Sequence, residues 1–431
     1  CSGWHSKPDP MTAFLSASER KRYVLTAIIG NVVEYYDLVI YSYFSAFIAR
    51  TFFPADLRFS QIALALATFG LSLLARPVGA YFLGGYADKN GRLPGLTACM
   101  ALMALGSALI AFCPSYAQIG GLAPCLIVFG RLIQGFSLGG EFGVATSFLI
   151  EQSPQHEAKR ASWQAIGQIL ASLCACSVVL LLGSIMSQQA YAQYGFRVAA
   201  VLGSCGGLVG LLLRASLGPR ERMPQVAVPK PAGVERYTAL RIVLVMGMVS
   251  LGSGITYLGF YMPHYAQNVF HVSARQTYWA AFATYAGQLL FTPVRWRLAT
   301  YFDQTKRIYP MLCSCTVLFL FPATLALWIP WTPLTVMVCP LLLNILGLFY
   351  FAALDGYMGL LFGKAHRGRG LSVGYSLGVA IFGGLAPLLN GATIQLTGYQ
   401  NAPLYYVMFT ACLAAVAVRQ GVYFLKETHS A

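Results

Sequence analysis

Four ionisable residues stand inside long apolar stretches of the sequence, where charge is otherwise rare. Glu34 and Asp37 are three residues apart, and Arg131 and Glu141 lie in a later stretch. On a helix, a spacing of three puts Glu34 and Asp37 on one face. Burial favours the neutral form of a carboxylic acid, whereas a nearby guanidinium favours the carboxylate. A carboxylate whose arginine partner moves can therefore load and release a proton, and these four residues are the candidates for proton coupling.

The elements that must hold these residues are helices in a membrane. The chain has 431 residues, of which 57% are hydrophobic and 10% are charged, and its mean hydropathy is +0.62. Soluble domains average about 25% charged residues. So little charge cannot cover a surface exposed to water, which excludes a soluble enzyme, a disordered chain and a disulfide scaffold. The sequence predicts an integral membrane protein.

Twelve apolar runs are long enough to cross a bilayer, since a helical span needs about 20 mostly apolar residues. The predicted spans are 24–49, 60–84, 94–112, 118–149, 162–186, 196–215, 239–266, 275–294, 308–328, 332–357, 369–393 and 402–424. We expect an all-α membrane protein with two six-helix bundles, 24–215 and 239–424. A polar linker, 216–238, joins them, and tails 1–23 and 425–431 flank them.

The basic residues orient the chain. There are 29 Lys and Arg against 14 Asp and Glu, a net charge of +15. With both termini in the cytosol, 23 of these Lys and Arg fall on inner segments and four on outer ones. Positive charge on the cytosolic side is typical of membrane proteins. The excess therefore predicts cytosolic termini and a bacterial inner membrane, with the lipid bilayer and no nucleic acid as partner.

Glu34 and Arg131 are predicted to lie at similar depth in the membrane. At 1.5 Å per residue, Glu34 is roughly 15 Å from the inner start of its span, and Arg131 is roughly 20 Å from the outer start of its own. In a hydrocarbon core of about 30 Å these positions nearly coincide. The sequence thus predicts that Arg131 pairs with Glu34 or Asp37. A static ion pair that fixes the helices is the alternative.

An anionic substrate needs positive charge in its cavity. Arg131 is the one cation that we predict deep inside a span, so it is the first candidate for a substrate carboxylate. The other candidates for substrate binding are Tyr36, Tyr257, Tyr261, His264, Gln288, Asp355 and Asn390. Two of these sites have a simpler interpretation. The Tyr257 and Tyr261 stripe is equally typical of packing, and His264 can face solvent.

A charged turn follows the second span and recurs after the eighth. Residues 84–92 read GGYADKNGR and residues 299–307 read ATYFDQTKR, with Asp and the final Arg four apart in both. Such charges can latch helix ends together, and their recurrence indicates a duplicated unit. The gating candidates are Arg76, Asp88, Lys89, Arg92, Asp303 and Arg307. Arg76 and Glu141, near the inner ends of their spans, suit either gating or coupling.

Gly135, Gly139 and Gly143 are spaced by four in the fourth span. A stripe of small residues at this spacing lets two membrane helices approach closely. We therefore expect a neighbouring helix to pack directly against this face.

These motifs resemble known families. Residues 84–92 fit the G-x-x-x-D-[RK]-x-G-R turn of the major facilitator superfamily, and RLIQG at 131–135 fits its R-x-x-Q-G motif. GNVVEYYD at 30–37, RLIQGFSLGGE at 131–141 and GYSLG at 374–378 resemble the metabolite:proton symporter family, closest to its citrate and tricarballylate symporters. The resemblance implies a major facilitator fold and symport of an organic anion, a tri- or dicarboxylate such as citrate, with a proton.

The second half departs from that family. Phe302-Asp303-Gln304 replaces an S-D-R sequence, and Leu361-Phe362-Gly363 replaces an acidic E-L-F-P stretch. The substrate therefore stays open between such an anion, a carboxylate siderophore and a zwitterion of the betaine or proline type. The chain has no metalloprotease or P-loop motif. We expect a monomeric transporter that is not an enzyme and uses no cofactor or metal.

Overall fold

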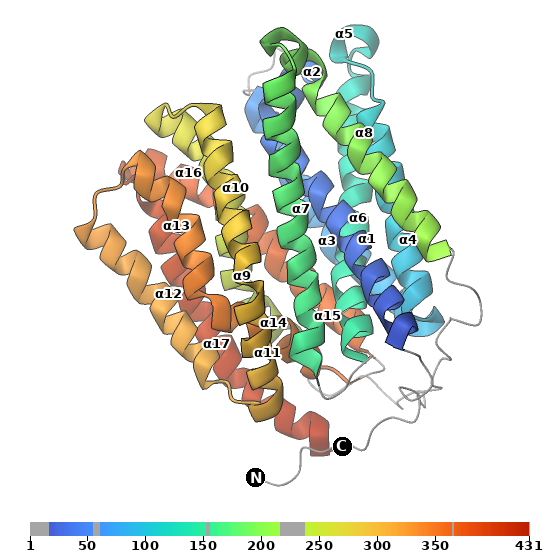
Figure 1. Ribbon diagram of the computed structural model, residues 1–431, viewed down its shortest axis with the longest axis vertical. Coiled ribbons are helices and arrows are strands. Elements are labelled where there is room, and N and C mark those ends of the chain that lie inside the picture. Colours follow the sequence, from blue (N-terminus) through green and yellow to red (C-terminus); the bar gives the residue numbers. More distant parts are fainter. Residues whose placement is uncertain (1–16, 55–60, 152–155, 216–237, 364–365, 431) are drawn as a thin grey trace.

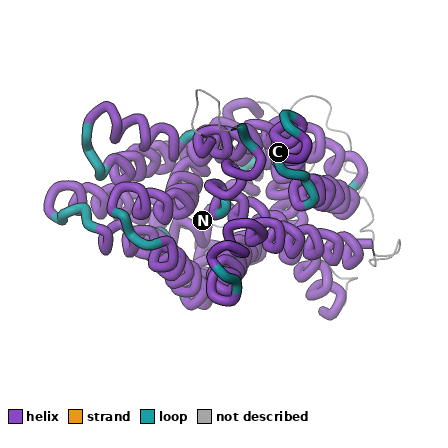
Figure 2. Tube along the Cα trace, turned by 90° about the horizontal axis from the view of Figure 1, so that it is seen from above, coloured by secondary structure: helices purple, strands orange, loops and turns teal. Residues whose placement is uncertain are grey.

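The computed structural model describes residues 17–54, 61–151, 156–215, 238–363 and 366–430. All regular elements in these ranges are helices, joined by short loops (Figure 2). The all-helical prediction is confirmed. The predicted linker lies outside the described residues except for Thr238.

The first half of the chain contributes eight helices, which lie together in Figure 1. They are α1 (Ala17–Tyr43), α2 (Ser45–Phe52), α3 (Gln61–Asn90), α4 (Arg92–Ala111), α5 (Tyr116–Ile119), α6 (Leu122–Glu151), α7 (Glu157–Ile185) and α8 (Gln188–Ala215).

The second half lies beside the first and begins at Thr238 (Figure 1). Its helices are α9 (Thr238–Phe270), α10 (Ala274–Leu290), α11 (Thr292–Thr305), α12 (Tyr309–Trp328), α13 (Pro333–Leu346), α14 (Leu348–Leu360), α15 (Arg367–Gly378), the π-helical turn η2 (Val379–Gly384), α16 (Ala386–Thr397) and α17 (Ala402–Ser430).

Among the described residues, nine helices are long and apolar enough to cross a membrane, or ten when the bent pair α13 and α14 counts as one span. The predicted spans 60–84 and 275–294 fall on α3 and α10, which do not meet this test over the described residues. α10 has only 17 residues. Multiple membrane-spanning helices are thus supported, and twelve spans stay a prediction.

The helices extend beyond the predicted spans at both ends of the chain. α1 begins at Ala17, inside the predicted tail 1–23, and α17 continues to Ser430 through the predicted tail 425–431. Charged residues end an apolar run without ending a helix, because Lys, Arg and Glu are good helix formers. α1 begins and α17 ends on the same side of the molecule (Figure 1).

Several predicted spans are broken helices. The run 332–357 bends by 56° between α13 and α14, at Gly347. The run 275–294 breaks at Phe291, where α10 ends and α11 begins. Pro293 stands in the first turn of α11, where a backbone N–H has no partner within the helix and its absence costs nothing. Because of these breaks, α11 and α14 pack against each other.

The glycine stripe of α6 packs directly on α3 at Gly135 and Gly139 and on α15 at Gly143, where an added Cβ atom would collide with Ser372. A Cβ atom added at Gly135 would collide with the backbone carbonyl of Ser72, and one added at Gly139 would collide with that of Arg76. Glycine is therefore required for this contact, as the spacing of four predicted. The contact fixes Arg76 and Ser72 relative to the charged residues of α6.

Candidate functional site

A cavity lies between the two halves of the molecule. It holds about 1170 Å³ of space not filled by protein atoms, including its opening. Most of its wall comes from α9, α10, α13 and α14, and one side comes from α7, with Tyr35 of α1, Phe142 of α6 and Tyr375 of α15. A wall that is mostly apolar with a few polar groups is typical of small-molecule sites.

Two charged residues line this cavity in the described part of the chain, Arg295 of α11 and Asp355 of α14. Both are buried. Arg295 Nη2 donates a hydrogen bond to the Phe351 carbonyl at 2.7 Å, whereas its Nε has no partner. The two side chains interact electrostatically without an ion-pair contact. The cavity thus offers one cation with hydrogen-bonding capacity to spare and one acidic group.

The rest of the wall combines aromatic rings with uncharged polar side chains. Tyr35, Tyr257, Tyr285 and Tyr375 supply the phenol rings. The polar side chains include Gln168, Ser172, Thr256, Thr277, Thr284, Gln288 and Asn344. Such a wall can orient a small polar molecule through hydrogen bonds while excluding bulk water.

The structure places three of the predicted substrate residues at this cavity: Tyr257, Gln288 and Asp355. The other predicted ones do not line it. The Tyr36 hydroxyl donates to the Ala199 carbonyl at 3.1 Å, towards α8. The Asn390 amide donates to the Ala386 carbonyl of its own helix at 2.7 Å. Sequence spacing identifies a helix face, but only packing decides which face meets the cavity.

Tyr261 and His264 lie away from the cavity on α9. Tyr261 packs against Tyr265, with ring centroids 5.7 Å apart. His264 is partly buried, and its Nε2 lies 3.0 Å from the Ser42 carbonyl of α1. The predicted solvent-facing alternative for His264 is therefore also wrong. Instead this residue joins the first and second halves.

Arg131 does not pair with Glu34. Its Nη1 donates to Gln134 at 2.7 Å and its Nη2 donates to Ser72 at 3.0 Å. Its guanidinium also stacks 4.1 Å from the Tyr41 ring centre. Arg131 is absent from the wall of this cavity, and its direct contact with a substrate stays a prediction. Glu34 and Arg131 were predicted at similar depth in the membrane, which allows an ion pair. Depth, however, does not fix the direction in which a side chain points.

A chain of hydrogen bonds nevertheless links Arg131 to Asp37. Gln134 accepts from Arg131 and donates through Nε2 to the Ser107 hydroxyl at 2.9 Å. Ser107 in turn donates to the Asp37 carboxylate. The predicted association of Arg131 with Asp37 is therefore indirect, through two neutral side chains.

Glu34 belongs to a different cluster. Ser137 donates to Glu34 at 3.2 Å, and the Glu34 carboxyl lies next to that of Glu141. Glu141 forms an ion pair with Arg214 of α8 at 3.0 Å, with 0% and 1% of the Arg214 and Glu141 side chains exposed. Two buried carboxyl groups thus share one adjacent guanidinium. An uncompensated buried charge is costly, so this cluster of two carboxyl groups and one guanidinium stays a candidate for proton coupling.

Arg76 reaches from α3 into the second half. Its Nη1 lies 3.5 Å from the Tyr257 hydroxyl, and its guanidinium lies 5.6 Å from the Tyr375 ring centre. Both tyrosines line the cavity. Arg76 therefore lies behind the cavity wall, at the junction of the halves.

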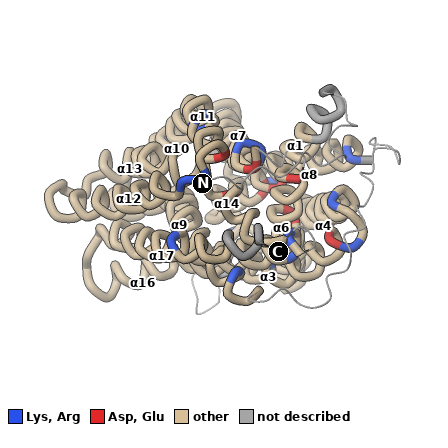
Figure 3. Tube along the Cα trace, turned by 90° about the horizontal axis from the view of Figure 1, so that it is seen from below, with Lys and Arg blue, Asp and Glu red and all other residues tan. Residues whose placement is uncertain are grey.

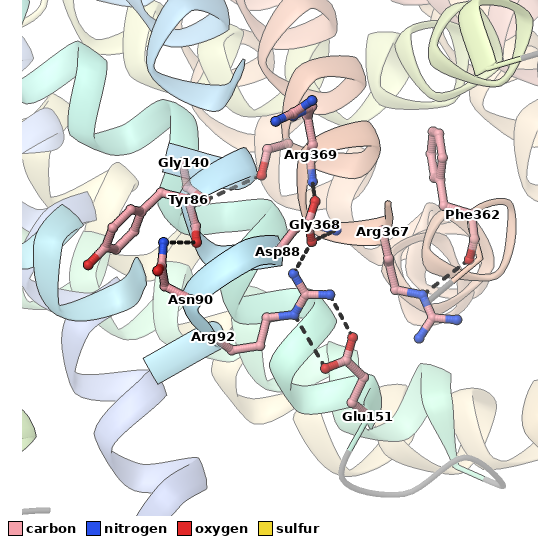
Figure 4. Close-up of polar contacts among 11 residues, drawn as sticks. Tyr86, Asp88, Asn90, Arg92, Gly140, Glu151, Phe362, Arg367, Gly368 and Arg369 are labelled. Atoms are coloured by element: carbon pink, nitrogen blue, oxygen red, sulfur yellow. Dashed lines mark hydrogen bonds and ion pairs between the residues drawn. The ribbon is translucent and has the colours of Figure 1, made fainter. Parts of the chain in front are cut away.

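Asp88, in the last turn of α3, caps a helix of the opposite half (Figure 4). The Asp88 carboxylate accepts from the backbone amides of Gly368 at 3.1 Å and Arg369 at 2.9 Å, at the start of α15. Arg92 contacts Asp88 and also donates to Glu151 at 2.8 Å. A carboxylate at a helix N-terminus is stabilised by the free amides and the helix dipole. This arrangement fits the predicted latch.

The turn after α11 makes the equivalent contact in the reverse direction. The Asp303 carboxylate accepts from the amides of Ala158 at 2.9 Å and Lys159 at 3.0 Å, at the start of α7. Lys306 forms an ion pair with Glu157 at 2.7 Å. Arg307, the predicted basic partner, is exposed, and Lys306 takes its place. The position before Arg307 faces α7, which the alignment of the two turns did not show.

The two latches lie on one side of the molecule. Figure 3 shows basic and acidic residues side by side there, near α4 and α7. Lys89 is exposed on the same turn as Asp88. On the other side of the cavity, His264 meets the Ser42 carbonyl, and the Tyr278 hydroxyl donates to the Tyr43 carbonyl at 3.1 Å. The halves therefore contact each other both above and below the cavity.

Sequence reasoning missed Arg214 and Arg295, because both were assigned to cytosolic segments. Arg214 stands within the predicted span 196–215, directly after three leucines, and that position was a usable signal. Arg295 follows the predicted span 275–294 by one residue. Its burial depends on the continuation of the chain as α11, which only the packing against α14 shows.

Known proteins match the chain over most of its length. A citrate-proton symporter of Salmonella typhi is 31% identical over 92% of this chain and 93% of its own. An alpha-ketoglutarate permease of Escherichia coli (strain K12) is 28% identical over 93% and 94%. A putative proline/betaine transporter of Staphylococcus aureus (strain MSSA476) is 29% identical over 91% and 86%.

Solved structures show the same fold. A proton:xylose symporter bound to 6-bromo-6-deoxy-D-glucose superposes with a TM-score of 0.77 at 15% identity, over 95% of this chain and 97% of the other. Residues 29–373 match the profile of the Major Facilitator Superfamily. The fold, the motifs and the relatives agree. The chain belongs to the Major Facilitator Superfamily, within its metabolite:proton symporters and close to the citrate symporters.

Proposed function

We propose that the protein is a secondary active transporter that carries a small organic anion together with a proton. It works as a monomer in a bacterial inner membrane, with cytosolic termini and twelve spans. The six spans of 24–215 and the six of 239–424 form two bundles, which rock around the central cavity and expose it to each side in turn. The substrate is a tri- or dicarboxylate such as citrate.

The position of Arg295 carries this proposal. Among the described residues it is the one cation in the cavity wall, and its Nε has no hydrogen-bond partner. A guanidinium binds carboxylates with two parallel hydrogen bonds. The names of the citrate and alpha-ketoglutarate relatives support a carboxylate as the ligand.

Proton coupling is proposed for the charged residues of the first bundle. Glu34 and Glu141 share Arg214, and Asp37 connects to Arg131 through hydrogen bonds. A change in protonation of these groups alters the charge balance between α1, α6 and α8. Because those helices build the first bundle, the change can favour one orientation of the bundles over the other.

Gating is proposed for the contacts above and below the cavity. The capped starts of α15 and α7 hold the inner side closed through Asp88 and Asp303. The contacts of α1 with His264 and Tyr278 hold the outer side. Alternating access then requires that one set breaks while the other holds.

The experiment is citrate binding and counterflow by the full chain in liposomes. Wild type is expected to bind and exchange citrate or alpha-ketoglutarate. Arg295→Gln loses charge-assisted hydrogen bonds of about 1.5–3 kcal/mol, so affinity falls by roughly 10- to 100-fold. Arg275→Gln, which removes an exposed arginine of α10, is the control and keeps wild-type affinity. If Arg295→Gln binds citrate as tightly as wild type, Arg295 does not bind the substrate.

A zwitterionic substrate is a second candidate because Asp355 shares the cavity with Arg295. A carboxylate on Arg295 and a cationic group near Asp355 and the tyrosine rings would satisfy both charges. The proline/betaine relative fits this alternative. If the protein exchanges glycine betaine but neither citrate nor alpha-ketoglutarate, the zwitterion replaces the organic anion as the proposed substrate. A citrate-based siderophore, tested in the same assay, covers the remaining alternative.

A further inference from the structure

We propose that Asp355 is a proton site linked directly to the substrate, because Asp355 and the substrate carboxylate compete for Arg295. The inference rests on the proposed function and specifies how that cavity couples its two ligands. It adds a second proton site, in the second half of the molecule, to the candidates of α1 and α6.

The geometry around Arg295 carries the inference. Arg295 lines the cavity, its Nη2 donates to the Phe351 carbonyl at 2.7 Å, and its buried Nε has no hydrogen-bond partner. Asp355 lies on the same helix as Phe351, one turn further along, and its carboxyl also lines the cavity. A substrate carboxylate that binds this guanidinium therefore enters the electrostatic reach of Asp355.

Charge balance then requires a proton. Before a substrate binds, the charges of Arg295 and Asp355 compensate each other, because the two buried side chains interact electrostatically. When a substrate carboxylate binds Arg295, two anionic groups face one cation in a buried space. Such an excess of buried charge is costly, and protonation of the Asp355 carboxylate removes it. The proton comes from the solution that fills the open cavity, and it leaves with the substrate on the other side.

No other charged side chain in the described cavity wall can take this role. Besides Arg295 on α11, the titratable groups that face Asp355 are Tyr375 of α15 and Tyr350 of its own helix. Tyr350 donates to the Met248 carbonyl, and Tyr375 stacks on Phe142 with ring centroids 3.4 Å apart. Among the cavity-wall residues that α6, α7, α9 and α13 contribute, Tyr257 of α9 is the one titratable side chain.

Glu34 and Glu141 differ from Asp355 in this respect. They are absent from the cavity wall and bond within the first half, to Ser137 and Arg214. A proton there can influence the substrate only through a change in conformation. A proton on Asp355 influences it through direct electrostatics. The two sites therefore predict different results in a binding experiment without transport.

The test is the number of protons taken up when citrate binds to the purified full chain. Calorimetry in buffers of different ionisation enthalpy, at one near-neutral pH, measures that number. We expect Asp355→Asn to bind citrate at least as tightly as wild type and to take up about one proton fewer. The substrate's own protonation cancels in this difference. Asp355→Glu restores the uptake, and the exposed-site control Arg275→Gln keeps it.

Two results overturn the inference. One is equal proton uptake by Asp355→Asn and wild type; the other is loss of citrate binding in a folded Asp355→Asn, which indicates a structural role or a cationic substrate group. If Asp355→Asn does not fold, Asp355→Ser is measured in the same way. Failure of wild type to bind citrate, alpha-ketoglutarate or any tested carboxylate counts against the proposed function instead, so the two failures are distinguishable.

Discussion

Arg214 of α8 donates a hydrogen bond to Glu141 of α6 across 3.0 Å, and the side chains are fully buried. Arg214 also donates to the Leu96 carbonyl of α4. One guanidinium thus ties three helices together and leaves Glu34 beside an already paired carboxylate. The relationship explains why the proton candidates of the first half form a cluster.

Breaking this pair is expected to destabilise the protein. Arg214→Met or Glu141→Gln alone leaves a buried group without its partner, at a cost of about 3–5 kcal/mol. The double variant removes both groups and should recover part of that loss. Thermal unfolding measures the stability of the three purified variants relative to wild type, and Arg275→Met is the control. Additive losses in the double variant would contradict the coupling.

Substitution of Glu34 is expected to weaken energy coupling without abolishing transport. One coupled proton is proposed at Glu34 and one at Asp355. At a gradient of one pH unit, neutralising either site therefore lowers the maximal ratio of internal to external substrate by a factor of about ten. Glu34→Gln should therefore lower the steady-state citrate ratio by up to about tenfold and keep counterflow. An unchanged ratio would show that Glu34 carries no coupled proton.

Asp88 and Asp303 are expected to protect the helix starts that they cap. Loss of such a carboxylate weakens the contact by about 1 kcal/mol, so local opening increases about fivefold. Hydrogen exchange should accelerate at Gly368 and Arg369 in Asp88→Asn, and at Ala158 and Lys159 in Asp303→Asn. Each variant is the control for the other. Equal acceleration at both sites would indicate general destabilisation instead.

Gly135 is expected to tolerate no side chain. In Gly135→Ala the new Cβ would collide with the Ser72 carbonyl, which forces α3 and α6 apart. Overpacking of this kind typically costs about 1–3 kcal/mol. Gly70→Ala is the matched control on α3, because nothing lies within 4 Å of its added Cβ. A thermal unfolding temperature lower in Gly135→Ala than in Gly70→Ala is the expected result.

The sequence predicted the fold well because its signals are local. Apolar runs identify membrane helices from composition alone, and the turn at 84–92 identifies the family. The same signals placed Asp88 and Asp303 at the junction of the halves. The breaks at Phe291 and Gly347 were not predictable from hydropathy, since they depend on packing as well as on nearby proline or glycine.

The site was predicted only in part. Tyr257, Gln288 and Asp355 line the cavity, whereas Arg131, Tyr36, Tyr261, His264 and Asn390 do not. Depth along a span follows from counting residues, but the direction of a side chain follows from which neighbour occupies that face. For this reason Arg131 stacks on Tyr41 while Arg295 faces the cavity.

By itself, the sequence determined that the chain is helical and carries apolar runs long enough to cross a membrane, because composition and spacing are properties of the chain alone. The recurring turn predicted a duplicated unit. The sequence also determined which few residues carry charge among the apolar runs. The tertiary structure decided how those charges combine. Glu141 pairs with Arg214, Arg131 reaches Asp37 through Gln134 and Ser107, and Arg295 shares the cavity with Asp355. These partners lie on different helices, and only packing brings them together.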